Sequence, residues 1–270
     1  MRIFLVKKRT LITAAAIIVC VILAVILVIA LSKDRQKPTF SIDAVEEYEL
    51  SVMAGRQREL PVYSVQRDDK KIALTIDAAW EDDKTPFILE ELDRQDVKAT
   101  FYLCGFWAKK YPDNVKAIHA AGHELGNHSM THPHMNSLSK KQIQKELIDF
   151  DDLLEKLIGK RSATFRAPYG EYNDTVITAT RELGYTPVQW SIDTIDWRAE
   201  RSAETILNSV ISKLEPGCII LCHNNGYQIK EYLPGLISAA KEQGYEFVPV
   251  SELLLDGNTM IDVNGVQKPA

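Results

Sequence analysis

The sequence predicts an α/β fold in which a parallel sheet is covered by helices, preceded by one transmembrane helix. Two observations support this prediction. From Lys71 to about Leu255, short β-rich apolar runs alternate with helical patterns, and repeated strand–helix units are typical of a parallel sheet. Near the amino terminus, residues 11–31 form an unbroken uncharged run. About seven strand–helix units would allow an incomplete barrel, and a doubly wound open sheet is the alternative.

The apolar run from Leu11 to Leu31 is rich in Ile, Val, Leu and Ala. As a helix it would be about 31 Å long, enough to cross the hydrocarbon core of a membrane. A cleaved signal peptide would have an apolar region of only about 7–15 residues and a small-residue cleavage site. We therefore expect an uncleaved single-pass anchor in the cell membrane. The span is preceded by Arg2, Lys7, Lys8 and Arg9. Positive charge at this position favours a cytoplasmic amino terminus and an extracellular remainder.

The expected organisation follows from this anchor. Residues 1–10 are a cytoplasmic basic stub, residues 11–31 the anchor and residues 32–69 a polar linker. Residues 70–256 form the folded domain and residues 257–270 a carboxyl-terminal tail. Within the linker, residues 62–65 could add an edge strand.

Strands and helices alternate within the domain. Ser139 is a suitable N-cap for a long helix that Gly159 would end, and Gly122 would end an earlier helix. Pro86 fits the first turn of the first helix. The expected strands are 72–76, 99–104, 163–165, 186–189, 217–221 and 247–250, with a short segment near 124–126. The expected helices are 85–92, 109–121, 140–158, 175–183, 203–214 and 233–243.

Composition and cysteine spacing exclude some classes of protein. The formal net charge of −5 argues against a nucleic-acid partner. None of the four cysteines forms a Cys-x-x-Cys pair. Cys218 and Cys222 would lie roughly 13 Å apart along one strand, whereas a disulfide needs Cα atoms within about 7 Å. We expect free core thiols.

Polar residues follow several of the predicted strands. In a parallel barrel, catalytic residues lie at the carboxyl ends of strands, so residues that are far apart in sequence converge there. This placement is the strongest indication of a site that the residues alone provide. The residues that follow predicted strands are Asp77, His128, His132, Arg166, Asp193, Asp196, Trp197 and His223.

The pair His128 and His132 is a candidate metal site. If the segment is one helical turn, the two imidazoles share a face and could bind Zn²⁺ at about 2.0–2.1 Å. No Glu follows the first His, so the pattern is not that of a metalloprotease. His134 could be a further ligand, but we favour a supporting or surface position. His119 and His123 are expected on a solvated face.

Four short motifs occur in fixed order: HSMTH (residues 128–132), RAPYG (166–170), DTIDW (193–197) and LCH (221–223). With them, the chain from about Lys71 to Leu255 resembles the NodB-like polysaccharide deacetylases, carbohydrate esterase family 4. It is most similar to the membrane-anchored peptidoglycan or sporulation-type enzymes of spore-forming bacteria. The resemblance implies a distorted seven-stranded (β/α) barrel that removes N-acetyl groups from sugar polymers.

One motif departs from the family pattern. The family has Thr-Phe-Asp-Asp-Gly, in which the first Asp is the base and the second binds metal. This chain reads TIDAAW (residues 75–80), so Asp77 matches the base and Ala78 replaces the metal-binding carboxylate. The metal site is therefore short of one ligand. Glu81, Asp82 or Asp83 could substitute, although each also fits a solvated loop.

The resemblance implies a role for each matching residue. Asp77 would be the general base, oriented by Arg166, for which a plain surface ion pair is the alternative. The backbone N–H of Tyr169 would stabilise the oxyanion. His223 would protonate the departing amine, with Asp193 or Asp196 raising its pKa. Trp197 and Leu221 would wall the acetyl pocket or simply belong to the core.

The expected cofactor is a divalent metal held by His128 and His132, with Zn²⁺ favoured over Co, Mn or Ni. The expected partners are the membrane and a cell-wall polysaccharide, most simply peptidoglycan. Two alternatives remain open. One is a catalytically impaired, glycan-binding pseudoenzyme of the same fold, and the other is a membrane-tethered structural or sporulation protein.

Overall fold

A computed structural model describes residues 58–270. Residues 59–270 form one compact unit. Within the described part, no helix is long and apolar enough to cross a membrane. The predicted anchor at residues 11–31, the first part of the predicted linker and Cys20 lie outside the described residues.

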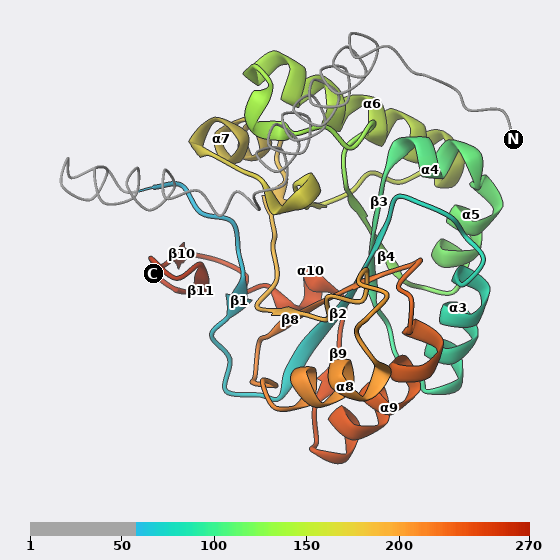
Figure 1. The fold of residues 1–270 in the computed structure, drawn as a ribbon. Helices are drawn as coiled ribbons and strands as arrows, with labels where there is room; N and C mark the ends of the chain where they lie inside the picture. The colour runs from blue at the N-terminus through green and yellow to red at the C-terminus, as the bar shows by residue number, and fades with distance from the viewer. Residues whose placement is uncertain (1–57) are drawn as a thin grey trace, which may run out of the picture. The chain divides into compact units, whose positions relative to one another are not determined.

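The domain is built on a sheet of parallel strands (Figure 1). Seven strands in the order β6-β5-β4-β3-β2-β8-β7 curl into a half-barrel, which confirms the predicted barrel-like α/β fold. A short strand, β9 (Glu246–Phe247), also pairs with β2. The seven strands are β2 (Lys71–Ala78), β3 (Thr100–Leu103), β4 (Glu124–Asn127), β5 (Thr164–Phe165), β6 (Thr186–Pro187), β7 (Ile192–Asp193) and β8 (Ile219–His223).

Helices surround the sheet and bury their apolar faces against it (Figure 1). The central strands supply fully buried Ile and Leu side chains that pack on apolar residues of these helices, as expected for a parallel sheet covered on its faces. The helices are α3 (Thr85–Arg94), α4 (Gly105–Lys110), α5 (Pro112–Ala120), α6 (Lys140–Ile158), α7 (Asp174–Glu182), α8 (Ala203–Ile211), α9 (Ile229–Glu242) and α10 (Val250–Leu253).

The predicted helix ends are confirmed where the sequence has strong capping signals. Ser139 caps α6, and its backbone N–H donates to the Gln142 side chain at 2.9 Å. Gly159 ends α6 in the left-handed conformation, with φ 70°. The predicted single helix at 109–121 is instead two helices. Pro112 disfavours a helical conformation for the preceding residue, and Tyr111 has φ −126° and ψ 57°.

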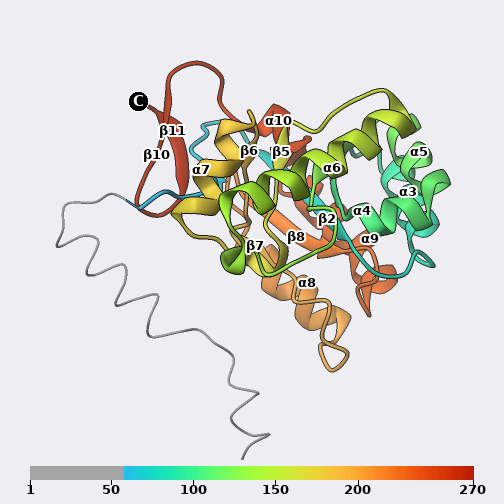
Figure 2. The ribbon, with the colours of Figure 1, turned by 90° about the horizontal axis from the view of Figure 1, so that it is seen from above.

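A second, three-stranded sheet joins the two ends of the described chain. Its order is β1-β11-β10, formed by β1 (Ser64–Val65), β10 (Thr259–Ile261) and β11 (Val266–Pro269). The expected edge strand at 62–65 therefore pairs with residues 266–267, in the segment expected to be only a tail. Figure 2 shows β10 and β11 at the end of the domain opposite to α3 and α5.

Two predictions about single residues have different outcomes. Cys218 and Cys222 are buried and free, as predicted. His123 is buried rather than solvated, so that prediction was wrong. The chain turns at Gly122, with φ 79°, and places the His123 ring 5.3 Å from the ring of Phe101. Burial lowers the pKa of His123 to about 4.

Candidate active site

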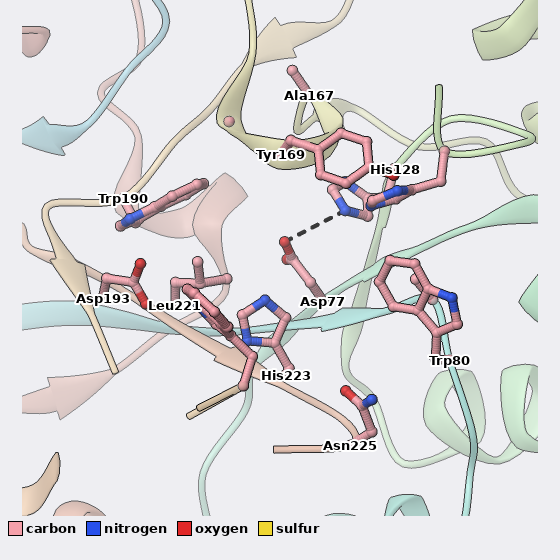
Figure 3. A pocket seen from close by; sticks show the side chains of 14 residues that line it. Asp77, Trp80, His128, Ala167, Tyr169, Trp190, Asp193, Leu221, His223 and Asn225 are labelled. Atoms are coloured by element: carbon pink, nitrogen blue, oxygen red, sulfur yellow. Dashed lines mark ion pairs between the residues drawn. The ribbon is translucent and has the colours of Figure 1, made fainter. Parts of the chain in front are cut away.

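A pocket of about 480 Å³ lies at the carboxyl ends of the strands (Figure 3). It brings together most of the residues that the sequence singled out. Arg166 and Asp196 are not among its lining residues. Both are fully buried and contact residues that line the pocket. The predicted residues that line it are Asp77, His128, His132, Tyr169, Asp193, Trp197, Leu221 and His223.

Asp77 and Arg166 form a buried ion pair at the base of the pocket. The Arg166 Nη1 atom lies 2.7 Å from Asp77 Oδ1 and 2.8 Å from the Thr75 hydroxyl oxygen. Arg166 is 0% exposed, so a plain surface ion pair is excluded. Burial alone would raise the pKa of the Asp77 carboxyl. The positive charge of Arg166 is the largest opposing effect. Together with the neighbouring histidines and the hydrogen bond from Arg166, it holds that pKa below its usual range.

The two histidines of the HSMTH motif meet in a loop and not on a helix. Strand β4 ends at Asn127, and the following segment is irregular. Ser129 and His132 adopt positive φ values of 68° and 57°, and the His132 N–H donates to the Ser129 hydroxyl oxygen at 2.9 Å. The rings of His128 and His132 are 5.0 Å apart. The expected juxtaposition is present, but the helical turn predicted as its cause is wrong.

The surroundings of His128 and His132 favour the neutral form of both imidazoles. The Nδ1 atom of His128 contacts the Arg166 carbonyl oxygen at 2.8 Å, which leaves Nε2 directed toward Asp77 Oδ2 at 3.6 Å (Figure 3). Burial lowers the pKa of His128. Burial and the neighbouring His128 lower the pKa of His132 to about 3. Neutral imidazole is the form that binds a metal.

The residues present fit a divalent metal. The Nδ1 atom of His132 is buried and has no hydrogen-bond partner among the described residues, so a donor atom is available. Cys104, His128 and His132 each offer a ligand atom, and these atoms lie within 4.8 Å of one another. Ala78 is fully buried at the end of β2.

The other residues suggested as ligands lie elsewhere. Within residues 58–270, Glu81, Asp82 and Asp83 do not belong to any group that could hold a metal. His134 lies on the surface. Its Nδ1 contacts the Glu171 carboxylate at 3.0 Å, and its ring stacks on Tyr169 with centroids 4.5 Å apart. This is the supporting or surface position that the sequence favoured.

His223 lies across the pocket from the histidine pair. Strands β2 and β8 are in register, with Asp77 opposite His223. Asp196 is the carboxylate that pairs with His223, with Nδ1 and Oδ1 2.7 Å apart. The Tyr232 hydroxyl donates to the other Asp196 oxygen at 2.6 Å. The Asp193 carboxylate instead accepts a hydrogen bond from the Ile195 backbone N–H at 2.7 Å, and so caps the loop that follows β7.

The His223–Asp196 pair sets the protonation of His223. Burial alone would lower its pKa. The hydrogen bond to Asp196 and the negative charge of that carboxylate outweigh burial and raise the pKa above its ordinary value. The site therefore holds an ionised carboxylate and, on the neighbouring strand, an imidazole whose pKa is raised. The first can accept a proton and the second can donate one, which are the roles of a general base and a general acid.

Aromatic side chains form the rim of the pocket. Trp80, Tyr169 and Trp197 are each about half exposed (50%, 54% and 53%), whereas Leu221 is buried at 3%. Trp80 and Tyr169 both contact the His132 ring edge-on, with centroids 4.8 Å and 4.4 Å away. Such surfaces suit the apolar faces of sugar rings.

The sequence did not single out several contributors to the site. Cys104 ends a predicted strand, so the strand-end rule could have found it. No comparable signal marks Tyr232, which lies on α9, or Trp190 in the loop before β7.

A base, an acid and two neutral histidines around one pocket define a hydrolase-type site on a half-barrel. The polysaccharide deacetylase family matches residues 64–188. A peptidoglycan-N-acetylglucosamine deacetylase of Bacillus cereus is 36% identical over 197 residues, which cover 71% of this chain and 92% of that protein. The peptidoglycan-N-acetylmuramic acid deacetylase PdaA of Bacillus subtilis is 32% identical over 191 residues, covering 70% of this chain and 73% of that protein.

A solved structure adds a second kind of relative. A CE4-family pseudoenzyme from Bacillus anthracis has a TM-score of 0.69 at 36% identity, covering 72% of this chain and 68% of that one. A mutant of that pseudoenzyme is described as having restored enzymatic activity. On these matches, the chain belongs to the polysaccharide deacetylase family, carbohydrate esterase family 4.

Proposed function

We propose that this protein hydrolyses N-acetyl groups of a cell-wall amino-sugar polymer, with peptidoglycan as the first candidate. The observation that carries the proposal is the placement of Asp77 directly opposite His223 in the strand register, with their pKa values moved in opposite directions. The two family members named above act on peptidoglycan by their names, which supports the choice of substrate.

Asp77 acts as the general base. The ion pair with Arg166 keeps the buried Asp77 carboxyl ionised at neutral pH, so that it can accept a proton from the attacking water. Arg166 fixes the carboxylate through Oδ1, which leaves Oδ2 on the side of His128. Thr75 shares the Arg166 Nη1 atom and so holds the guanidinium in place.

His223 acts as the general acid. It remains protonated to higher pH than an ordinary histidine, so it can give its proton to the departing sugar amine. Asp196 holds Nδ1, which leaves Nε2 to face the pocket. Tyr169 and Trp197 line the entrance and position the glycan, and the Tyr169 backbone N–H is the proposed oxyanion donor.

His128 and His132 would hold a divalent metal, with Zn²⁺ favoured. A metal there would polarise the acetyl carbonyl and lower the barrier to attack. The membrane anchor at residues 11–31 belongs to the same proposal, because an extracellular domain tethered to the cell membrane would face the wall.

The test is release of acetate from purified peptidoglycan by the full chain, before and after treatment with a chelator. We expect steady release that the chelator stops and added Zn²⁺ restores. Mass spectrometry of the digested product would identify which amino sugar has lost its acetyl group. Absence of acetate from peptidoglycan and from N-acetylglucosamine oligomers would contradict the proposal.

A second candidate function is glycan binding without hydrolysis. Ala78 stands where the family has a metal-binding carboxylate, and a pseudoenzyme is among the similar structures. This candidate predicts that the protein retains peptidoglycan in a pull-down assay but releases no acetate at any metal concentration.

A further inference from the structure

The proposed metal site lacks an anionic ligand at its usual position. His128 and His132 supply two nitrogen donors, and the Ala78 side chain has no donor atom. Catalytic zinc sites have three protein ligands plus water. A third ligand must therefore come from another element if the site is to bind metal as tightly as such sites do.

Cys104 lies next to the position of the missing carboxylate. Strands β2 and β3 pair in parallel, with Ala78 opposite Leu103. Ala78 is the last residue of β2 and Cys104 directly follows β3. The Cys104 backbone N–H donates to the Ala78 carbonyl oxygen at 3.0 Å. The Cys104 side chain is fully buried and is not part of a disulfide.

The sulfur is within reach of both histidines. Cys104 Sγ contacts the His128 carbonyl oxygen at 3.3 Å. The ligand atoms of Cys104, His128 and His132 lie within 4.8 Å of one another. Zn–S and Zn–N bonds of about 2.3 and 2.0–2.1 Å in a tetrahedron place sulfur and nitrogen about 3.5 Å apart. Closing the largest of these separations, 4.8 Å, to that distance requires a movement of about 1.3 Å or less.

We propose that Cys104 is the third metal ligand and replaces, from the next strand, the carboxylate absent at position 78. This inference rests on the metal-dependent function proposed above. A thiolate and two neutral imidazoles carry the same charge as a carboxylate and two neutral imidazoles, so the electrostatics at Asp77 and His223 are preserved. Sulfur is a softer donor than oxygen, so the site should select Zn²⁺ or Co²⁺ over Mn²⁺ or Mg²⁺.

The test uses the full chain loaded with Co²⁺, whose absorption reports its ligands. A Co–thiolate bond gives a sulfur-to-metal charge-transfer band in the near ultraviolet. We expect that band in the wild type and in Cys218→Ala, the matched control, because Cys218 is a buried cysteine that precedes β8, at the far end of that strand from His223. Cys104→Ala should lose the band and bind the metal at least about tenfold more weakly.

A second variant separates a ligand from a packing residue. Adding Ala78→Asp to Cys104→Ala should restore tight metal binding, because a carboxylate returns to the usual position, while the charge-transfer band stays absent. A merely structural role for Cys104 predicts no such rescue. Bound Co²⁺ without the band in the wild type, failure of the wild type to bind Co²⁺, or persistence of the band in Cys104→Ala would each overturn the inference.

Failure of the inference and failure of the proposed function are distinguishable. Acetate release without a charge-transfer band would support the deacetylase function and show that the third ligand is not Cys104. A charge-transfer band without acetate release would support Cys104 as a metal ligand in a protein that does not deacetylate glycans.

Discussion

The two histidines that flank Asp77, His128 and His223, have the same side chain and opposite electrostatics. Each contacts an oxygen through Nδ1, at 2.8 Å for His128 and 2.7 Å for His223. For His128 this oxygen is the neutral backbone carbonyl of Arg166. For His223 it is the carboxylate of Asp196. Burial acts to lower the pKa of both rings. At His223 the Asp196 carboxylate outweighs burial and raises the pKa above its ordinary value, whereas the pKa of His128 stays lowered.

This difference assigns chemistry that the residue type alone does not. A histidine kept neutral can donate a lone pair to a metal, whereas a histidine kept protonated can give a proton to a leaving group. The half-barrel places the two on either side of one carboxylate, at the ends of β4 and β8 (Figure 3).

The largest expected effect is loss of turnover in His223→Ala. Removing the proton donor for the amine should lower kcat about 10²–10⁴-fold, measured as acetate release with circular dichroism to verify the fold. The matched control is His119→Ala on α5, which does not line the pocket. Equal turnover of wild type and His223→Ala would rule out the acid role.

Arg166→Met tests the ion pair that holds Asp77, the carboxylate between His128 and His223. It leaves the buried Asp77 carboxylate without its partner, so the free energy of unfolding should fall by about 3–5 kcal/mol. Urea denaturation measures this change. Arg161→Met is the control, because Arg161 is half exposed in its ion pairs with Asp152 and Glu155, and exposed pairs contribute about 1 kcal/mol or less. Similar losses for both variants would contradict a buried, site-forming ion pair.

Asp196→Asn should make His223 electrostatically more like His128. Without the carboxylate the pKa of His223 falls. Activity that needs protonated His223 disappears as pH rises through that pKa, so the alkaline limb of kcat/KM should move to lower pH. Asp193→Asn should move it less, because Asp193 bonds the Ile195 N–H instead. An unmoved limb in Asp196→Asn would mean that another group controls it.

The smallest expected effect is that of Tyr232→Phe. The change removes one buried hydrogen bond to the Asp196 carboxylate, and a bond to a charged group is worth about 1.5–3 kcal/mol of unfolding free energy. Thermal or urea unfolding measures it. Tyr227→Phe, at an exposed tyrosine, should leave stability unchanged. No loss in Tyr232→Phe would show that Asp196 does not depend on this hydroxyl.

The sequence predicted the fold and the membership of the site better than the contacts within it. Strand–helix alternation and strand-end placement were enough to bring Asp77, His128 and His223 to one pocket. The choice between Asp193 and Asp196 was not accessible, because it depends on the direction of side chains in a loop where Ile195 has φ 53°. Positive-φ residues also bring His128 and His132 together, where sequence spacing suggested a helical turn.

The contacts of Cys104 could not be predicted from the sequence either. Its position at a strand end was visible in the sequence, but its closeness to His128 depends on the pairing of β3 with β4 and on a buried rotamer. Pattern analysis gives neither.

The most direct test of the account compares acetate release from purified peptidoglycan by the wild type and by Asp77→Asn, both folded and loaded with Zn²⁺. We predict progressive release by the wild type and a rate about 10²–10⁴-fold lower for the variant. If the two proteins release acetate equally, or if neither releases any, the assignment of this pocket as a deacetylase active site is wrong.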